Sequence, residues 1–349
     1  MFYFCAQNTD IMFQIQENIS LQPYNSFGIT AKARFFAEIF DESDLIALSK
    51  LPEFSGQKLL VMGGGSNMLF TEDFDGLVIK ISIQGIESTA DGENVLVTAG
   101  AGVVWNDFVQ YCVGNNYAGV ENLSLIPGTV GASPIQNIGA YGVELKDVFL
   151  ECRAFELKTG AFKTFSFENC HFGYRESIFK GELKGKFIIT SVTFKLTSIP
   201  RLNTSYGAIE AELEKRGIVN PGIADISAAV AHIRVSKLPD PTTIGNAGSF
   251  FKNPVIEKYE FADVVANHPD VVHYATADGK VKLAAGWLIE QCGWKGKIVG
   301  HTGTWKNQAL VLVNHGGATG KEVYALSEQI IDSVKSTFGV TLEREVNIL

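Results

Sequence analysis

The sequence predicts an α+β protein with more than one domain. Segments of helical and strand periodicity are interspersed along its 349 residues without strict β–α alternation. Hydrophobic residues make up 46% of the chain and charged residues 19%, which is enough apolar material for large buried cores. This composition excludes disorder as the main state, and the length leaves room for two or three domains.

Individual elements follow from local patterns. Residues 41–51 predict a short capped helix, and the apolar run 58–62 predicts a strand that stops abruptly at three glycines. The same rules predict strands at 77–83, 95–102, 187–196 and 340–346, and helices at 103–113, 208–217, 226–237, 282–293 and 320–338. The loop-like residues 197–206 place a domain border near residue 198.

Charge and special residues narrow the function classes. The net charge of −9 argues against nucleic acid or an anionic membrane as the main partner, although a small anion needs only a local basic pocket. No apolar run approaches the length of a membrane span, and the start of the chain lacks the basic flank of a signal peptide. We therefore expect a cytoplasmic protein, with Met12 as a candidate native start.

Cysteine and histidine spacing favours neither disulfides nor metal. The five cysteines are widely spaced without a Cys-x-x-Cys pair, which fits a reducing compartment. The six histidines form no metal-binding spacing, and we expect no metal site.

The first glycine-rich segment is VMGGGSN at 61–67. Glycines allow backbone N–H groups to approach a ligand closely, and successive N–H groups form a concave site for phosphate oxygens. Neither the dinucleotide fingerprint nor the P-loop pattern matches. A phosphate cradle and a plain hairpin turn both remain compatible with these residues.

The second segment is LIPGTVGASPIQNIGAYG at 125–142, which carries hardly a charge. A long uncharged segment with side-chain amides is suited to surround a flat, neutral ring. The alternative is an ordinary surface loop, which would usually carry more charge.

Five motifs together resemble the UDP-N-acetylenolpyruvoylglucosamine reductase family, flavoenzymes of bacterial peptidoglycan synthesis. They are GGGSN, IPGTVGASPIQNIGAYG, FGYRES, KLPDP and GNAGSFFKNP, in family order between Asn25 and the C-terminus. The resemblance implies an FAD-binding region of the vanillyl-alcohol-oxidase (PCMH) type, made of two α+β subdomains over residues 12–198. It also implies a smaller α+β substrate-binding domain over 199–319, with a tyrosine-bearing insertion near 203–217. The resemblance leaves open whether the C-terminal helix and strand, residues 320–349, pack back on the first FAD-binding subdomain.

The resemblance also implies a reaction. NADPH reduces non-covalently bound FAD, and the reduced flavin passes hydride to the terminal vinyl carbon of UDP-N-acetylglucosamine enolpyruvate. A protein acid protonates the adjacent carbon, which gives UDP-N-acetylmuramate. We expect a monomer that serves cell wall biogenesis, cell shape and cell division.

Three catalytic residues are carried over by motif. Ser249 matches the proton donor, Arg175 matches the arginine that holds the substrate carboxylate, and Glu345 matches a second acid. Without the motifs, Ser249 reads as a turn serine, Arg175 as a partner of Glu176, and Glu345 as an exposed glutamate. Glu343 lies two positions from Glu345 and is the competing choice.

The remaining carried-over residues bind cofactor or substrate. The FAD contacts are glycines, hydroxyls and amides of the two glycine-rich segments: Gly63, Gly64, Gly65, Ser66, Asn67, Pro127, Gly128, Ser133, Gln136, Asn137 and Gly139. The contacts to the UDP-sugar are basic, amide and aromatic residues: Tyr206, Arg234, Lys237, Asn253, Tyr274 and Gln308. For each tyrosine, a packing role is the alternative.

Two other functions stay open at this point. One is an alcohol or hydroxyacid oxidase of the same FAD fold, against which KLPDP and GNAGSFFKNP argue. The other is a non-catalytic nucleotide-sugar binder without flavin, against which the intact glycine-rich segments argue.

Overall fold

The protein is described by a computed structural model that covers residues 13–51, 56–276 and 278–349. The proposed start at Met12 lies outside the described residues. The chain forms two compact units. Of the described residues, unit 1 comprises 13–19, 33–51, 56–64 and 74–234, and unit 2 comprises 20–32, 65–73, 235–276 and 278–349.

Unit 1 contains a four-stranded sheet with the order β1-β2-β5-β3. Its strands are β1 (Ile15–Ser20), β2 (Lys32–Ile39), β5 (Phe74–Ile81) and β3 (Leu59–Met62). β2 and β3 both run parallel to β5, so the carboxyl ends of these three strands lie at one edge. Helix α1 (Glu42–Ser49) starts at the cap Asp41 and packs Leu45 and Leu48 into the core of this sheet.

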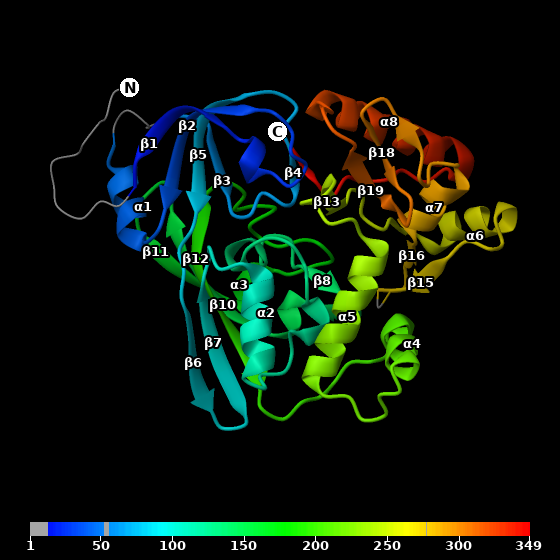
Figure 1. The fold of residues 1–349 in the computed structure, drawn as a ribbon, viewed down its shortest axis with the longest axis horizontal. Coiled ribbons are helices and arrows are strands. Elements are labelled where there is room, and N and C mark those ends of the chain that lie inside the picture. The colour runs from blue at the N-terminus through cyan, green and yellow to red at the C-terminus, as the bar shows by residue number, and fades with distance from the viewer. Residues whose placement is uncertain (1–12, 52–55, 277) are drawn as a thin grey trace. The chain divides into compact units, whose positions relative to one another are not determined.

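A five-stranded sheet follows in unit 1, with the order β11-β10-β12-β7-β6. It consists of β11 (Phe162–Ser166), β10 (Phe149–Glu156), β12 (Phe187–Thr197), β7 (Asn94–Gly100) and β6 (Ile86–Asp91). Helix α2 (Trp105–Gly114) lies against this sheet (Figure 1). Its Trp105 and Phe108 pack in the core, where both rings meet Phe194 of β12. Both sheets carry a helix, which fits the predicted α+β class, and the division of residues 12–198 into two subdomains stays a prediction.

Shorter elements complete unit 1. They are η3 (Glu121–Leu123), η4 (Val130–Ala132), the hairpin β8 (Gly139–Ala140) with β9 (Val143–Glu144), η5 (Leu145–Asp147), α3 (Phe167–Cys170), α4 (Gly207–Lys215) and most of α5 (Ile223–Lys237). Helices α4 and α5 share a small core of Ile209, Leu213, Ile226 and Val230. Both glycine-rich segments therefore lie in or beside short elements and turns.

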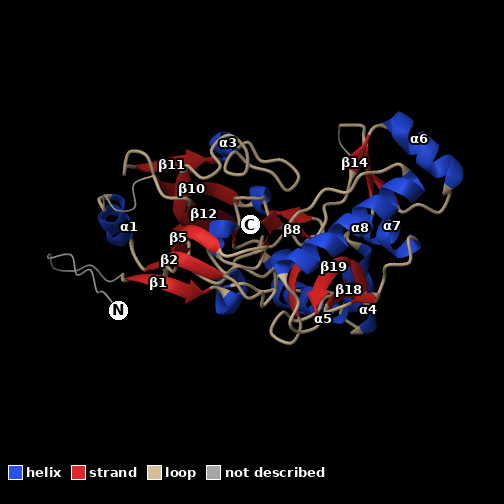
Figure 2. Cartoon of the chain, turned by 90° about the horizontal axis from the view of Figure 1, so that it is seen from above, coloured by secondary structure: helices blue, strands red, loops and turns tan. Residues whose placement is uncertain are grey.

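Unit 2 is built on a second four-stranded sheet with the order β13-β19-β18-β17. Helices α7 and α8 lie against β19 and β18, as Figure 2 also shows. The elements of unit 2 are η1 (Gln22–Tyr24), β4 (Met68–Leu69), β13 (Gly245–Ser249), β14 (Val255–Ile256), α6 (Lys258–Asn267), β15 (His273–Ala275), β16 (Val281–Leu283), α7 (Ala285–Gln291), β17 (Ile298–Val299), β18 (Thr302–Trp305), β19 (Gln308–Asn314), α8 (Gly320–Phe338) and β20 (Asn347–Ile348). Strand β20 pairs with β4.

Most predicted elements are confirmed, and two need correction. The helix predicted at 282–293 begins only at Ala285, because Val281–Leu283 form strand β16 between β14 and β15. The strand predicted at 340–346 is absent as a ladder. Only Arg344 forms a bridge, with Phe251, and regular pairing resumes at β20.

The compact units differ from the predicted domain borders. Residues 199–234 belong to unit 1, and residues 320–349 belong to unit 2, where α8 contacts α7 and β18. The assignment of cofactor and substrate binding to separate domains stays a prediction.

Candidate active site

The two glycine-rich segments meet in unit 1. Gly63 and Gly64 follow β3 at the edge where the parallel strands end. A Cβ at Gly63 would overlap the hydroxyl oxygen of Thr129, and a Cβ at Gly64 would come within 3.2 Å of the Cα of Gly128. Only residues without a side chain allow this approach. Backbone at the carboxyl edge of parallel strands is a common position for a nucleotide cofactor.

The residues at this edge fit FAD. The Thr129 hydroxyl oxygen is buried and has no hydrogen-bond partner within the described residues. A buried hydroxyl without a partner is costly, so a polar ligand group would satisfy it. The loop itself is fixed, because Trp105 N–H donates to Gly128 O at 3.0 Å and Val130 N–H donates to Val103 O at 2.9 Å. A rigid, uncharged cradle with an orphaned donor suits a bound flavin nucleotide.

The rest of the first segment continues into unit 2. Gly65 has a φ of +63°, and a Cβ there would overlap the carbonyl of Tyr24. Ser66 and Asn67 are half-buried, and Asn67 donates to Glu345 O at 3.3 Å. The GGGSN motif thus ends beside the C-terminal segment.

The residues of the second segment that are predicted to contact FAD differ in how deeply they are buried. Ser133 is buried with its hydroxyl on Val130 O at 2.6 Å, whereas Gln136 is half-buried and Pro127 is exposed. Of residues 125–142, five are buried, nine are half-buried and four are exposed, so the loop is only partly buried. Contact of these residues with FAD stays a prediction.

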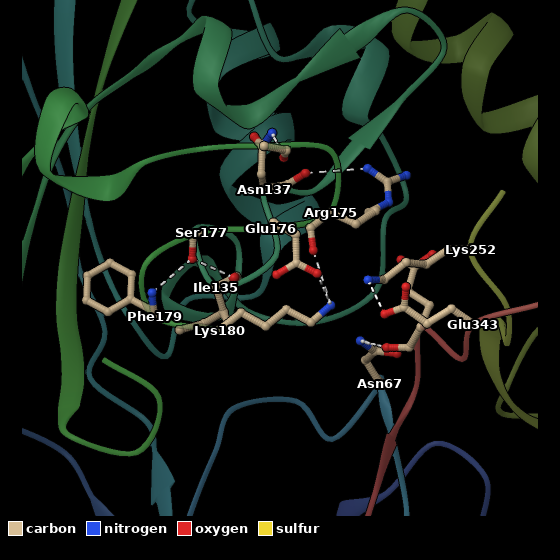
Figure 3. A network of polar contacts seen from close by, with 12 residues as sticks. Asn67, Ile135, Asn137, Arg175, Glu176, Ser177, Phe179, Lys180, Lys252 and Glu343 are labelled. Carbon is tan, nitrogen blue, oxygen red and sulfur yellow. Dashed lines mark hydrogen bonds and ion pairs between the residues drawn. The ribbon is translucent and has the colours of Figure 1, made fainter. Parts of the chain in front are cut away.

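Arg175 is held by this second segment (Figure 3). Its guanidinium donates to Gly139 O at 2.6 Å and to Asn137 O at 3.4 Å. Its own backbone has a φ of +56°, and Lys180 Nζ donates to its carbonyl at 3.1 Å. Residues other than glycine rarely adopt positive φ, and such strain often marks functional sites. Glu176 forms an ion pair with Lys180, at 3.8 Å.

Asn137 fixes the backbone around Arg175 through hydrogen bonds. This fully buried residue also has positive φ, and its Nδ2 donates to Gly173 O at 3.0 Å and to Glu144 Oε2 at 3.2 Å. Its Oδ1 accepts from Lys146 N–H at 3.0 Å. These bonds go to the protein, so Asn137 positions the loop. Its predicted contact with FAD is not tested by them.

A basic group gathers in unit 1 around Arg234 of α5. Burial lowers the pKa of Arg234, and the charge of Arg175 lowers it further, while the Tyr141 phenol raises it. Burial also raises the pKa of Tyr141, whose ring packs edge-on against Tyr206 at 5.3 Å. Two guanidinium groups that repel each other favour a shared anion. Tyr141 lies in the motif IPGTVGASPIQNIGAYG but is not among the residues predicted from the sequence to bind substrate.

The segments that carry Ser249 and Glu345 lie side by side in unit 2. Gly248 has a φ of +68°, and the pairing of β13 with β19 shifts register between Asn246 and Ser249. Such bulges re-aim a side chain. The next residue, Phe250, accepts from Glu345 N–H at 2.8 Å through its carbonyl. Ser249 and Glu345 are both half-buried.

The predicted substrate contacts occupy separate places within their units. Lys237 is exposed at the end of α5, and Tyr274 is exposed on β15. Asn253 accepts from Ala285 N–H at 3.0 Å at the start of α7, and Gln308 accepts from Leu310 N–H at 3.3 Å. Among the described residues, no hydrogen bond or ion pair joins any two of these four side chains.

Metal and membrane features are not found in the part of the chain that the structure describes. No group of three or more His, Cys, Asp or Glu side chains there could hold a metal ion. None of the described helices has the length and apolar character needed to cross a membrane.

Comparison with known proteins shows which families and which solved structure this chain resembles. An FAD binding domain model matches residues 33–166, and the model of the UDP-N-acetylenolpyruvoylglucosamine reductase C-terminal domain matches residues 240–349. A crystal structure of UDP-N-acetylenolpyruvylglucosamine reductase from Thermus caldophilus shares the fold, with a TM-score of 0.67 and 24% identity over 97% of this chain and 99% of that chain. The fold and site thus define an FAD-dependent oxidoreductase of the predicted α+β class.

Relatives with the same name cover nearly the whole chain. The UDP-N-acetylenolpyruvoylglucosamine reductase of Flavobacterium johnsoniae is 50% identical over 96% of this chain and all of its own length. That of Pseudomonas aeruginosa is 49% identical over 96% of this chain and 99% of its own length. The chain belongs to the UDP-N-acetylenolpyruvoylglucosamine reductase family.

Proposed function

We propose that this protein uses NADPH to reduce the enolpyruvyl group of UDP-N-acetylglucosamine enolpyruvate to the lactyl group of UDP-N-acetylmuramate. Two observations carry the proposal for a chain of this family: a glycine-lined cradle that fits FAD within unit 1, and the neighbouring segments of Ser249 and Glu345 within unit 2. The enzyme serves cell wall synthesis, cell shape and cell division from the cytoplasm.

When bound, FAD would supply the hydride transfer from NADPH to the vinyl carbon of the substrate. The backbone at Gly63, Gly64 and Gly128 would hold the cofactor, and the Thr129 hydroxyl would offer it a hydrogen bond. The proposal includes no covalent link to FAD.

The protein itself manages the proton and the developing charge. Ser249 donates the proton to the carbon that bears the ether oxygen, on the backbone bulge that aims its hydroxyl. Hydride addition moves negative charge toward the substrate carboxylate, which Arg175 stabilises. Glu345 shares in the proton transfer from the neighbouring segment.

The polyanionic nucleotide explains the local positive charge of a protein whose net charge is −9. Arg234 and Lys237 lie one turn apart on α5, where they bind the diphosphate. Tyr206, Tyr274, Asn253 and Gln308 supply aromatic and amide contacts to the sugar nucleotide.

Isotope placement tests the proposal. With 4-deuterated NADPH in water, we expect one deuterium in the new methyl group of UDP-N-acetylmuramate. With unlabelled NADPH in deuterium oxide, we expect one deuterium at the carbon that bears the ether oxygen. Solvent deuterium in the methyl group instead would contradict the roles assigned to FAD and Ser249. Oxygen uptake with simple alcohols would favour the oxidase alternative.

A further inference from the structure

Lys252 and Glu343 form an ion pair in unit 2, which Figure 3 draws. Lys252 Nζ lies 2.5 Å from Glu343 Oε1. The lysine side chain is 9% exposed, whereas the glutamate side chain is 71% exposed. One member of the pair is therefore buried and the other lies at the surface.

The backbone joins the same two segments. Lys252 N–H donates to Glu343 O at 2.9 Å, Phe251 bridges Arg344, and Glu345 N–H donates to Phe250 O at 2.8 Å. Residues 250–252 and 343–345 thus run antiparallel over one short stretch. Ser249 directly precedes the first segment, and Glu345 ends the second.

These contacts are few, because no regular strand forms over residues 340–346. Ser249 is anchored on its other side by pairing with Val311 of β19. The C-terminal segment is anchored to α8 through Arg344, whose Nε donates to Ser327 Oγ at 2.8 Å. Between these anchors, the Lys252–Glu343 pair is a side-chain link between the two segments, three residues from Ser249 on one and two residues from Glu345 on the other.

A buried ammonium is an expensive way to gain stability. Apolar residues of similar volume usually serve at least as well, so a buried ion pair is weak evidence for a stabilising role. An ion pair does fix the register of two segments, and register determines which backbone atoms face each other. A displacement near 1 Å at a reacting group can lower a rate by about a hundredfold.

We propose that Lys252 is a positioning residue, which through Glu343 sets the C-terminal segment so that Glu345 stands at working distance from Ser249. This inference rests on the proposed function. Lys252 acts on the substrate-reduction step and not on the reduction of FAD by NADPH.

Two half-reactions measured anaerobically in the FAD-loaded enzyme separate these roles. For Lys252→Met, we expect the rate constant of flavin reoxidation by UDP-N-acetylglucosamine enolpyruvate to fall by roughly tenfold to a hundredfold. Flavin reduction by NADPH and the KM for the UDP-sugar should stay within about threefold. Lys252→Arg keeps the charge and should recover most of the rate.

The charge partner gives a second test. Glu343→Gln should lower the same rate constant, and the double variant Lys252→Met with Glu343→Gln should be no slower than the slower single variant, because both act through one link. Lys295→Met is the matched control, since Lys295 pairs with Glu290 at 2.8 Å on the surface of the same unit. It should leave both half-reactions within twofold. If Lys252→Met does not fold, the rate constant of flavin reoxidation in the isosteric variant Glu343→Gln tests the positioning role instead.

Failure of this inference differs from failure of the proposed function. Equal losses in both half-reactions, or losses within twofold in Lys252→Met and Glu343→Gln, would overturn the positioning role. Ser249→Ala serves as the reference, and it should abolish flavin reoxidation by the substrate. If Ser249→Ala reoxidises normally, the proton donor assignment itself fails, whatever the Lys252 variants do.

Discussion

Gly63 shows how one missing side chain determines local packing at the candidate cofactor site. Its backbone lies so close to Thr129 that a Cβ would overlap the threonine hydroxyl, and the second and third nearest atoms also belong to Thr129. The glycine is therefore required by a specific neighbour and not by a general need for flexibility, because its φ is not in the left-handed region.

This contact predicts a compensating pair. Gly63→Ala should lower the free energy of unfolding by about 1–3 kcal/mol, because it overpacks the loop. Removal of the hydroxyl in Thr129→Ala clears most of the overlap, so adding Gly63→Ala to that variant should cost far less. Urea unfolding of the four proteins measures the coupling. Equal costs of Gly63→Ala in both backgrounds would rule out this contact as the cause.

Lys237 tests substrate binding at the same scale. In the proposed function, its exposed ammonium at the end of α5 binds the diphosphate in the ground state and in the transition state alike. Lys237→Ala should therefore raise the KM for the UDP-sugar by about tenfold or more, with kcat nearly unchanged. Lys295→Ala controls for the loss of a surface charge. A fall in kcat at constant KM would instead give Lys237 a part in the chemistry.

Adjacent strands β2 and β5 carry a polar group that responds to pH. Glu38 accepts from Lys80 and from Ser82 Oγ, the latter at 2.6 Å. Burial alone would raise the pKa of Glu38, but these hydrogen bonds and the Lys80 charge bring it below its ordinary value of 4.5. A lowered folded-state pKa stabilises the fold above the ordinary pKa, and this contribution is lost as the pH falls through the folded-state pKa.

Glu38→Gln should expose that contribution. The urea midpoint of the native protein should exceed that of the variant most at pH 7, and the gap should narrow as the pH falls below about 4.5. Glu290→Gln, at a surface ion pair, provides the control for loss of a carboxylate. A gap that widens in acid would contradict the lowered pKa.

Sequence patterns predict those elements that are stabilised by interactions between residues close together in the chain. The helix at 320–338 is confirmed residue for residue, because Thr319 and Glu322 form a capping box and Gly339 closes the helix with a φ of +70°. The strand at 340–346 fails, because its pairing depends on three residues of a distant segment and not on its own alternation. β16 was missed for the same reason, since it forms only between β14 and β15.

The site shows the same limit. Ser249 and Glu345 were selected by motif, and the structure places their segments side by side. Lys252 lies in the motif GNAGSFFKNP, but no sequence pattern predicts that its charged side chain is buried against Glu343. The orphaned hydroxyl of Thr129 likewise depends on a contact between segments more than sixty residues apart.

For the whole molecule, burial predicts which thiols react. Burial raises the pKa of Cys112, and a hydrogen bond with Cys170 together with burial raises that of Cys152. These three cysteines are buried, whereas Cys292 is half-buried. Brief alkylation of the native protein, mapped by mass spectrometry, should modify Cys292 well before the other three. Equal labelling of Cys112 and Cys292 would show that the core opens on that timescale; the urea-unfolded protein should label throughout.

The net charge of the whole molecule bears on which anionic ligands it admits. A surface with a charge of −9 repels polyanions in general, while Arg175, Arg234 and Lys237 are candidates to admit one nucleotide sugar. The alternatives of an oxidase and a flavin-free binder differ from the proposed reductase in what reoxidises the cofactor, or in whether a cofactor is present at all.

Anaerobic titration of the purified protein tests that difference most directly. NADPH should bleach the flavin absorbance, the bleached state should persist under argon, and one equivalent of UDP-N-acetylglucosamine enolpyruvate should restore the oxidised spectrum with formation of UDP-N-acetylmuramate. A protein without flavin absorbance after FAD is supplied, or one whose bleached flavin ignores this substrate but recovers rapidly with oxygen, would contradict the account.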